Sequence, residues 1–149
     1  SMQNQGLFDD SLEALDLIIN QKMGTYAELA EMQKANILLE QNKEKEALAL
    51  LEKIANDKSR SLQLRDTALI KLASYRQDGA TFEEMSELLS SITKSKDNAW
   101  YAVAEDMLAT ILLRDGNIEQ AKEIYNALLE NQDTPDDLKN RIKDILSVL

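Results

Sequence analysis

Residues Arg114–Pro135 read RDGNIEQAKEIYNALLENQDTP, and this stretch decides the fold. Gly116 follows a run of helix formers. A glycine in this place fits the left-handed residue that ends many helices. Ala121 and Tyr125 come next at helical spacing, and Thr134-Pro135 has the form of a further helix start. The stretch therefore predicts a turn, one complete helix and the beginning of another.

The same pattern occurs 74 positions earlier in the chain. There Asn42 takes the place of Gly116, and Ala47 takes the place of Ala121. Other positions match as well: Leu50 with Ile124, Leu51 with Tyr125, Ile54 with Leu128, Ala35 with Ala109, and Leu38 with Leu112. This self-similarity indicates that the opening stretch is one unit of an internal repeat.

A middle copy is expected halfway between these two. Asp78-Gly79 stands 37 residues before Asp115-Gly116, and this copy has one extra residue in its turn. Apolar residues follow at helical spacing: Phe82, Met85, Leu88, Leu89 and Ile92. A period near 37 residues with two helices per copy is typical of a helical-hairpin solenoid.

The composition agrees with an all-α fold. The chain is 44% hydrophobic and 30% charged, with only four glycines and one proline, so little in it interrupts helices or favours strands. We expect one domain over residues 1–149, a right-handed helical-hairpin solenoid of about eight antiparallel helices. The expected helices are 7–21, 25–41, 44–56, 61–77, 82–93, 97–114, 118–131 and 135–148.

Local signals mark the ends of these helices. Thr25–Glu28, Thr81–Glu84 and Asn117–Gln120 each place a short polar residue three positions before Glu or Gln, which is the capping-box pattern. Gly79 and Gly116 are expected to be left-handed residues at helix ends. Small residues are expected where the two helices of a hairpin cross, because alanine lets the axes approach to about 8–9 Å. These are Ala35, Ala47, Ala109 and Ala121.

The repeat resembles the tetratricopeptide repeat, which has a small residue in its first helix, a glycine or asparagine in its turn and an alanine five residues later. The resemblance covers about residues 25–131, in copies at about 25–57, 61–94 and 97–131, with a C-terminal capping helix at 135–148. There are departures from the pattern. Met85 replaces the alanine in the middle copy, Asn42 replaces the glycine in the first copy, and the usual tryptophan of the first helix is absent.

The N-terminal segment, residues 6–22, is expected to be half a repeat. Gly6-Leu7-Phe8 stands 36 residues before Asn42, in register with the repeat turns. A solenoid that begins halfway through a repeat leaves an apolar flank uncovered, here Leu12, Leu15 and Ile19. We therefore expect a native N-terminal extension that includes a membrane anchor, or a homodimer through this helix. The alternative is an atypical N-terminal cap.

Several function classes find no support in the residues. The chain has no cysteine and no histidine, which excludes thiolate chemistry, serine–histidine systems and zinc sites that need these ligands. A net charge of −10 makes nucleic acid and anionic lipid poor partners. The paired carboxylates Asp9-Asp10, Glu83-Glu84 and Asp136-Asp137 are expected at helix starts, where they complement the helix dipole. We expect no catalytic residue, no cofactor and no metal, and hence no enzyme.

The C-terminal part is similar to the YfgM-like family, ancillary subunits of the SecYEG translocon. The matching residues are Trp100, Ala104-Glu105, Gly116-Asn117, Thr134-Pro135 and Arg141. Members have one membrane helix and a repeat domain outside the inner membrane, and they are associated with the Sec translocon and periplasmic chaperones. The resemblance thus implies a periplasmic interaction scaffold that contacts the membrane only through an N-terminal anchor. The alternative is a soluble cytoplasmic adaptor of the same fold with an unrelated partner.

A protein or peptide partner is expected on the first helices of the copies, which line the concave face of a hairpin solenoid. An apolar floor with flanking charges suits a peptide or helix laid in a groove. Each residue taken alone also fits an ordinary core position. The expected groove residues are Leu29, Met32, Asn36, Leu39, Asp66, Leu69, Ile70, Ala73, Arg76, Val103, Asp106, Met107, Thr110 and Leu113.

Overall fold

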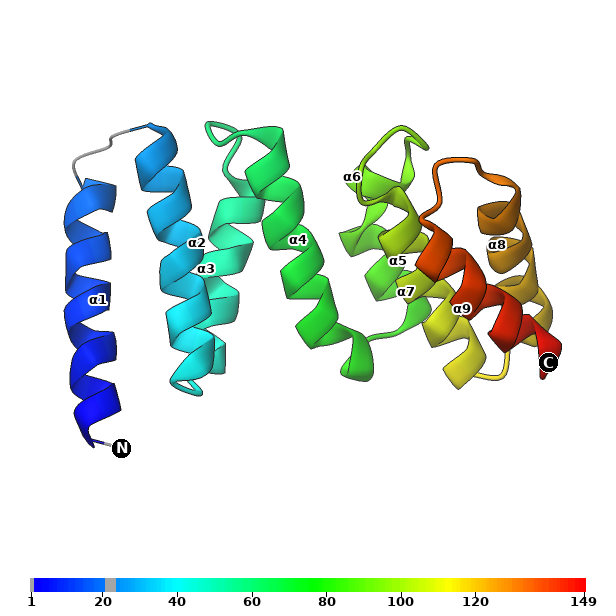
Figure 1. The fold of residues 1–149 in the computed structure, drawn as a ribbon, viewed down its shortest axis with the longest axis horizontal. Coiled ribbons are helices and arrows are strands. Elements are labelled where there is room, and N and C mark those ends of the chain that lie inside the picture. The colour runs from blue at the N-terminus through cyan, green and yellow to red at the C-terminus, as the bar shows by residue number, and fades with distance from the viewer. Residues whose placement is uncertain (1, 21–23) are drawn as a thin grey trace. The chain divides into compact units, whose positions relative to one another are not determined.

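The computed structural model describes residues 2–20 and 24–149, and their regular structure is entirely helical (Figure 1). No strand occurs in these two segments, which confirms the all-α, helical-hairpin fold. The elements are α1 (Met2–Asn20), α2 (Thr25–Glu40), α3 (Glu44–Asn56), α4 (Leu62–Arg76), the short 3-10 helix η1 (Gln77–Gly79), α5 (Phe82–Leu88), α6 (Ser90–Thr93), α7 (Tyr101–Arg114), α8 (Ile118–Glu130) and α9 (Asp136–Ser147).

The chain divides into two compact units, and each is described by itself. Unit 1 extends to Leu72 and unit 2 begins at Ala73, so the boundary falls inside α4. Unit 1 contains α1, α2, α3 and the first part of α4. Unit 2 contains the last turn of α4 and all later elements.

Unit 1 is built from α1, α2 and α3, which lie side by side and run alternately in opposite directions (Figure 1). Ala35 of α2 and Ala47 of α3 are both fully buried, as predicted for the crossing of the two helices. Leu51 and Ile54 complete the buried face of α3. The small side chains let the helices approach while the larger ones fill the space beside them.

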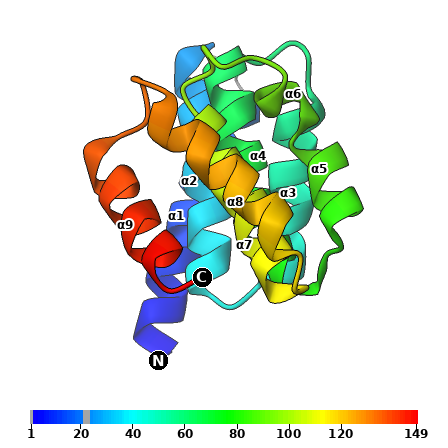
Figure 2. The same ribbon diagram turned by 90° about the vertical axis from the view of Figure 1, so that its right-hand side faces the viewer.

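Unit 2 is organised around the hairpin of α7 and α8, with α9 packed against α8 (Figure 2). Ala109 and Ala121 are fully buried where the two hairpin helices meet, as predicted. They belong to one core cluster that also includes a buried residue of α9. The cluster consists of Ala109, Leu112, Ala121, Tyr125, Leu128 and Ile142.

When the hairpin α2–α3 is shifted by 74 positions, the end of its first helix and both ends of its second helix coincide with those of α7–α8, whereas α7 begins two residues later, at Tyr101. Their turns match in detail, because Asn42 and Gly116 are both left-handed, with φ of 61° and 81°. In both turns the next residue donates its N–H to a carbonyl five residues back, Lys43 to Leu38 and Asn117 to Leu112, each at 2.8 Å. The predicted equivalence of the first and third copies is therefore confirmed at the level of the backbone.

The middle copy departs from the prediction at its turn. Five residues, 77–81, link α4 to α5, whereas three residues form each of the other two turns. Gly79 ends η1 without a positive φ, so the prediction of a left-handed residue there is wrong. The extra length is taken up by the 3-10 turn, which makes the left-handed residue unnecessary.

Two other predicted helices have different limits. The expected helix 82–93 is divided into α5 and α6 by a turn at Leu89. The expected helix 97–114 begins only at Tyr101, because Asn98 forms a side-chain turn in which its Oδ1 accepts from the N–H of Trp100 at 2.8 Å. Short polar side chains favour such turns over continued helix.

One of the three predicted capping boxes is present. Thr81 Oγ1 accepts from the N–H of Glu84 at 3.1 Å, and the Glu84 carboxylate accepts from the N–H of Thr81 at 3.3 Å. The other two predictions are wrong: Gly24 rather than Thr25 precedes α2, and Asn117 makes no side-chain cap. At the start of α9 the cap position is taken by Pro135, with two acids in the first turn as expected.

Helix α1 differs most from its prediction. It begins at Met2, so Gly6 lies inside the helix and does not form a repeat turn, and Asp9-Asp10 lie in mid-helix rather than at a helix start. The predicted ends of the helix at residue 21 and of the half repeat at residue 22 lie outside the described residues. Leu15 is buried and Leu12 and Ile19 are partly buried, so the expected uncovered flank is wrong. Among the side chains of α1 that the structure describes, the large apolar ones that are exposed are Leu7 and Leu17.

Candidate functional site

The clearest candidate surface in unit 1 is the exposed face of α2. Leu29 is 55% exposed, while Met32, Asn36 and Leu39 are partly buried, so these four predicted residues form a half-open surface along the helix. They lie on one side of the helix because they are spaced by three or four residues. This surface is mainly apolar, with the Asn36 amide as its one polar group.

Contacts between α2 and the segment that begins α4 hold this surface in place. The Glu28 carboxylate of α2 accepts from the N–H and the hydroxyl of Ser61, at 3.0 and 3.1 Å. Asn36 accepts a hydrogen bond from the ammonium group of Lys71 on α4. Lys71 was missed from the sequence, because its partner lies 35 residues away and no spacing rule connects them.

A small apolar patch stands at the end of this surface, formed by Tyr26, Leu29 and Leu62, and it is called the Tyr26 patch here. Tyr26 and Leu62 are 69% and 62% exposed. Leu62 follows Ser61 directly, and Ser61 is bonded to the residue before Leu29, so the first turns of α2 and α4 are adjacent. Both helix starts lie at the same end of the unit in Figure 1. Exposed aromatic and leucine side chains of this kind are typical of contact surfaces.

The predicted groove residues of α4 are less accessible than expected. Asp66, Leu69, Ile70 and Ala73 are all buried, at 9% exposure or less. Their side chains belong to the packing of the chain and not to an open surface. Arg76, at the end of α4, is partly buried.

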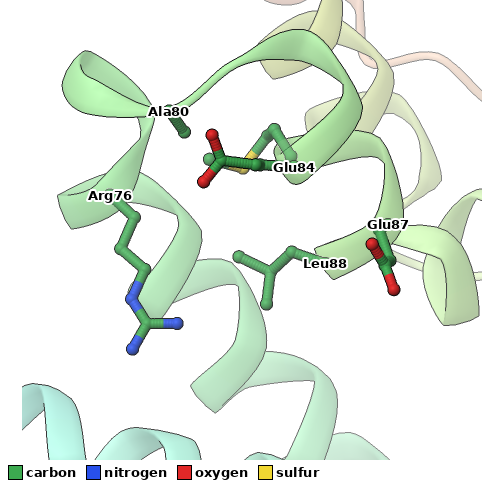
Figure 3. A pocket seen from close by; sticks show the side chains of 6 residues that line it. Arg76, Ala80, Glu84, Glu87 and Leu88 are labelled. Atoms are coloured by element: carbon green, nitrogen blue, oxygen red, sulfur yellow. The ribbon is translucent and has the colours of Figure 1, made fainter.

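Arg76 lines a hollow of about 280 Å³ in unit 2, together with residues of the α4–α5 link and of α5. In Figure 3 the Leu88 side chain points into this hollow and the Arg76 side chain runs along its opposite side. Glu84 points into the same space, although its carboxylate already belongs to the capping box. The hollow therefore has an apolar floor and a charged rim.

Some of the predicted groove residues of α7 already contact α9. Arg141 of α9 forms an ion pair with Asp106 of α7. Val103 and Asp106 line a hollow of about 440 Å³ with Pro135, Leu138 and Arg141. Met107 and Leu113 are partly buried and Thr110 is exposed. The sequence placed Asp106 on this face but gave no sign that Arg141 meets it.

The predicted groove residues that stay accessible fall into two separate sets. In unit 1 the structure brings Leu29, Met32, Asn36 and Leu39 onto one face beside α4. In unit 2 it brings Val103 and Asp106 against α9. A continuous groove across all three copies stays a prediction.

Glu31 of α2 and Glu105 of α7, at equivalent positions of their helices, both have a raised pKa. Burial raises the pKa of Glu31, although the guanidinium of Arg60 opposes this effect. Burial also raises the pKa of Glu105, and here no cation opposes it. Tyr101, one turn before Glu105, has its pKa raised by burial and by the Glu105 charge.

The described segments contain neither a candidate metal site nor a candidate membrane-spanning helix. No group of three or more acidic, histidine or cysteine side chains there is placed to hold a metal ion. None of the helices in residues 2–20 and 24–149 is both long enough and apolar enough to cross a bilayer.

The comparisons with known proteins identify a family but no individual relative. The model of the tetratricopeptide repeat-like domain matches residues 3–146, which is almost the whole chain. No curated protein matches the sequence. No solved structure matches it either.

Proposed function

Because the chain belongs to the tetratricopeptide repeat-like family, we propose that it is a non-catalytic scaffold that binds a protein or peptide partner. Domains of this family are in general interaction modules and not enzymes. The observation that supports the role for this chain is the exposed apolar surface of α2, with Leu29 at 55% exposure beside Tyr26 and Leu62. Its position is fixed by the hydrogen bonds of Glu28 and Asn36.

The chemistry of this surface favours a partner with apolar side chains at helical or extended spacing. Leu29 and Leu39 offer apolar contacts, and Met32 between them can adapt its conformation to different partners. A partner helix laid along α2 would also contact the Tyr26 patch, where an aromatic ring can supply a large contact area. No residue of this surface needs to react for such binding to occur.

We further propose that the scaffold faces the periplasm, is tethered to the inner membrane and acts with the Sec translocon or with periplasmic chaperones. The support is the sequence pattern shared with the YfgM-like family, including Trp100, Thr134-Pro135 and Arg141. Two of these residues have structural roles consistent with a family pattern. Thr134 is buried at the α8–α9 link, and Arg141 pairs with Asp106.

The proposed location is tested by the gene and by fractionation. The gene is expected to encode about 20 consecutive apolar residues upstream of Gln3. Protease added to spheroplasts should then degrade the domain, while intact cells protect it. A domain that is protected in spheroplasts and released with the cytoplasmic fraction would instead indicate the soluble adaptor.

The proposed binding surface is tested by site-specific crosslinking in native cells. A photo-reactive residue is placed at Leu29, and a matched control is placed at Ala49, which is exposed on α3 of the same unit. We expect the Leu29 derivative to crosslink a Sec component or a periplasmic chaperone and the Ala49 derivative to crosslink neither. Equal crosslinking of such a protein from both positions would contradict the assignment of the α2 surface.

A further inference from the structure

The segment after the second helix of a hairpin has the same conformation in the first and third copies. Residues 57–61 and 131–135 show the same sequence of turn, bend and extended residues, again 74 positions apart. Arg60 donates its N–H to the Asp57 carbonyl at 3.0 Å, and Thr134 does the same to Asn131 at 3.2 Å. The side-chain oxygens of Asp57 and Asn131 each accept from the N–H two residues later, at 3.0 and 2.9 Å. Arg60 and Thr134 therefore leave the backbone at equivalent points.

In the first copy, the side chain at this point is an arginine that returns to the first helix of its own hairpin. The guanidinium of Arg60 forms an ion pair with Glu31 of α2, and its Nε lies 3.5 Å from the Asp57 carboxylate. Glu31 is only 6% exposed, so the arginine supplies the positive charge that this buried carboxylate needs.

In the third copy, the carboxylate is kept but the arginine is missing. Glu105 of α7 occupies the position of Glu31, and Thr134 occupies the position of Arg60. Among the described residues, no side chain makes a hydrogen bond or an ion pair with Glu105. Glu105 is partly buried, and this burial raises the pKa of its carboxyl group with no cation to oppose the effect.

A cavity and an unpaired hydroxyl are found where the arginine side chain would begin. Thr134 is 3% exposed, and its Oγ1 has no hydrogen-bond partner. It lines a cavity of about 160 Å³ together with Tyr101, Ala102 and Asn131. Glu105 does not itself line the cavity, but it follows Tyr101 and Ala102 by one helical turn on the same side of α7.

We propose that this cavity receives an arginine side chain from a partner protein, with Glu105 and the Thr134 hydroxyl as acceptors for its guanidinium. The partner residue takes the role that Arg60 has in the first copy. A guanidinium fits better than an ammonium group, because its planar donors can reach two acceptors at once. The residues that line the cavity include two exposed acids, Asp97 and Asp133, against one exposed cation, Lys96, which favours a positively charged guest. This inference rests on the proposed scaffold function and names the chemistry that one partner residue must have.

The test uses the whole chain, labelled with ¹⁵N, and N-acetyl-arginine methylamide as the probe. We expect saturable shifts of the amide signals of Tyr101, Asn131 and Thr134, with a dissociation constant on the order of 1–10 mM for so small a ligand. The Glu105→Gln variant should bind about tenfold more weakly, because a charge-assisted hydrogen bond is lost. The matched Glu31→Gln variant should bind as the wild type does, since Arg60 already occupies that site. The melting temperature of each variant shows that it is folded.

The neutral analogue N-acetyl-citrulline methylamide has nearly the same shape as the arginine probe and should cause no saturable shift. Equal binding of the two probes, an unchanged affinity of Glu105→Gln, or an equal loss in Glu31→Gln would overturn the arginine site. Any of these results would leave the scaffold function standing if crosslinking from Leu29 still identifies the expected partner. Failure of that crosslinking together with saturable, Glu105-dependent arginine binding would overturn the α2 surface alone.

Discussion

The alanines at the hairpin crossings determine how closely the helices pack. Ala47 is fully buried against α2, whereas Ala49 on the same helix is exposed. We expect Ala47→Leu to lower the free energy of unfolding by about 1–3 kcal/mol, because the added methyl groups force the helices apart. Ala49→Leu, the matched control, should change it by less than about 0.5 kcal/mol. Urea denaturation of the two variants measures the difference, and equal values would contradict the crossing role.

The left-handed residue at position 116 can be tested in a similar way. Gly116 has φ of +81°, where a side chain is strained, and Gly79 has no positive φ. Gly116→Ala should therefore reduce the free energy of unfolding by about 1 kcal/mol. Gly79→Ala should leave it unchanged or raise it slightly, since an added Cβ there meets no atom within 4 Å. Thermal unfolding that ranks the two variants in the opposite order would count against the turn assignment.

The Glu105 carboxylate makes stability depend on pH in a defined direction. Burial raises its pKa in the folded chain above the ordinary value of 4.5, so the folded state binds the proton more tightly than the unfolded state. The ionised side chain therefore destabilises the fold at neutral pH, and this effect is lost as pH falls through the folded-state pKa. We expect Glu105→Gln to melt at a higher temperature than the wild type at pH 7, and the difference to disappear below about pH 4.5. A constant difference between pH 7 and pH 4 would contradict this explanation.

At the scale of elements, Arg114 connects the end of α7 to the unusual α4–α5 link. Its guanidinium donates to the carbonyls of Gln77, Asp78 and Ala80, at 2.9, 3.2 and 2.7 Å. These carbonyls lie beyond the end of α4, where an α-helix leaves its last carbonyls without partners of its own, and of the three only that of Gln77 accepts a backbone N–H within the link, from Ala80. One planar cation thus organises the five-residue turn in which the middle copy differs from the other two.

We expect Arg114→Lys to loosen this link, because an ammonium group cannot direct donors to three carbonyls in one plane. The side chain is partly exposed, so the loss of stability should be modest, about 1 kcal/mol. Hydrogen exchange of the Ala80 amide, which donates to Gln77, should become faster, while exchange at Asn117 in the α7–α8 turn should stay unchanged. Protection at Ala80 equal to the wild type would show that Arg114 is not what holds the link.

Most of the helices could be predicted because their signals are local. The turn residues Asn42 and Gly116, the alanine positions and the Thr81 capping box all depend on residues within one turn of each other. The misassigned features depend on competing or distant interactions. Glu28 bonds to Ser61, which directly precedes α4, and not to a residue of its own helix start, and no sequence pattern reveals this pairing.

The candidate site was harder to predict than the fold for the same reason. Repeat register correctly placed Leu29 and Asn36 on one face of α2, yet it could not show that Leu69 and Ile70 are buried. Register also could not show that Arg141 reaches Asp106, since α9 lies outside the repeated segment. Thr134 can be recognised as the equivalent of Arg60 only when the structure shows that the two link segments have the same conformation.

For the whole molecule, the important property is that the first and third copies share one backbone geometry at their turns and links but carry different side chains there. Such arrays can keep their fold while each copy specialises, because a repeat mainly contacts its neighbours. The net charge of −10 adds a general preference for cationic partners, and the site beside Glu105 gives that preference a defined place. In the proposed scaffold, the α2 surface supplies apolar contact area and the Thr134 cavity supplies charge recognition.

The most direct test of this equivalence is a double-mutant cycle that combines Thr134→Arg with Glu105→Gln, read out by the free energy of unfolding in urea. If the first and third copies share one geometry, the introduced side chain meets Glu105 as Arg60 meets Glu31. The predicted coupling energy between the two positions is then about 1–2 kcal/mol in favour of the arginine–glutamate pair. A Thr134→Arg effect that is the same with Glu105 and with its glutamine substitute would contradict the account.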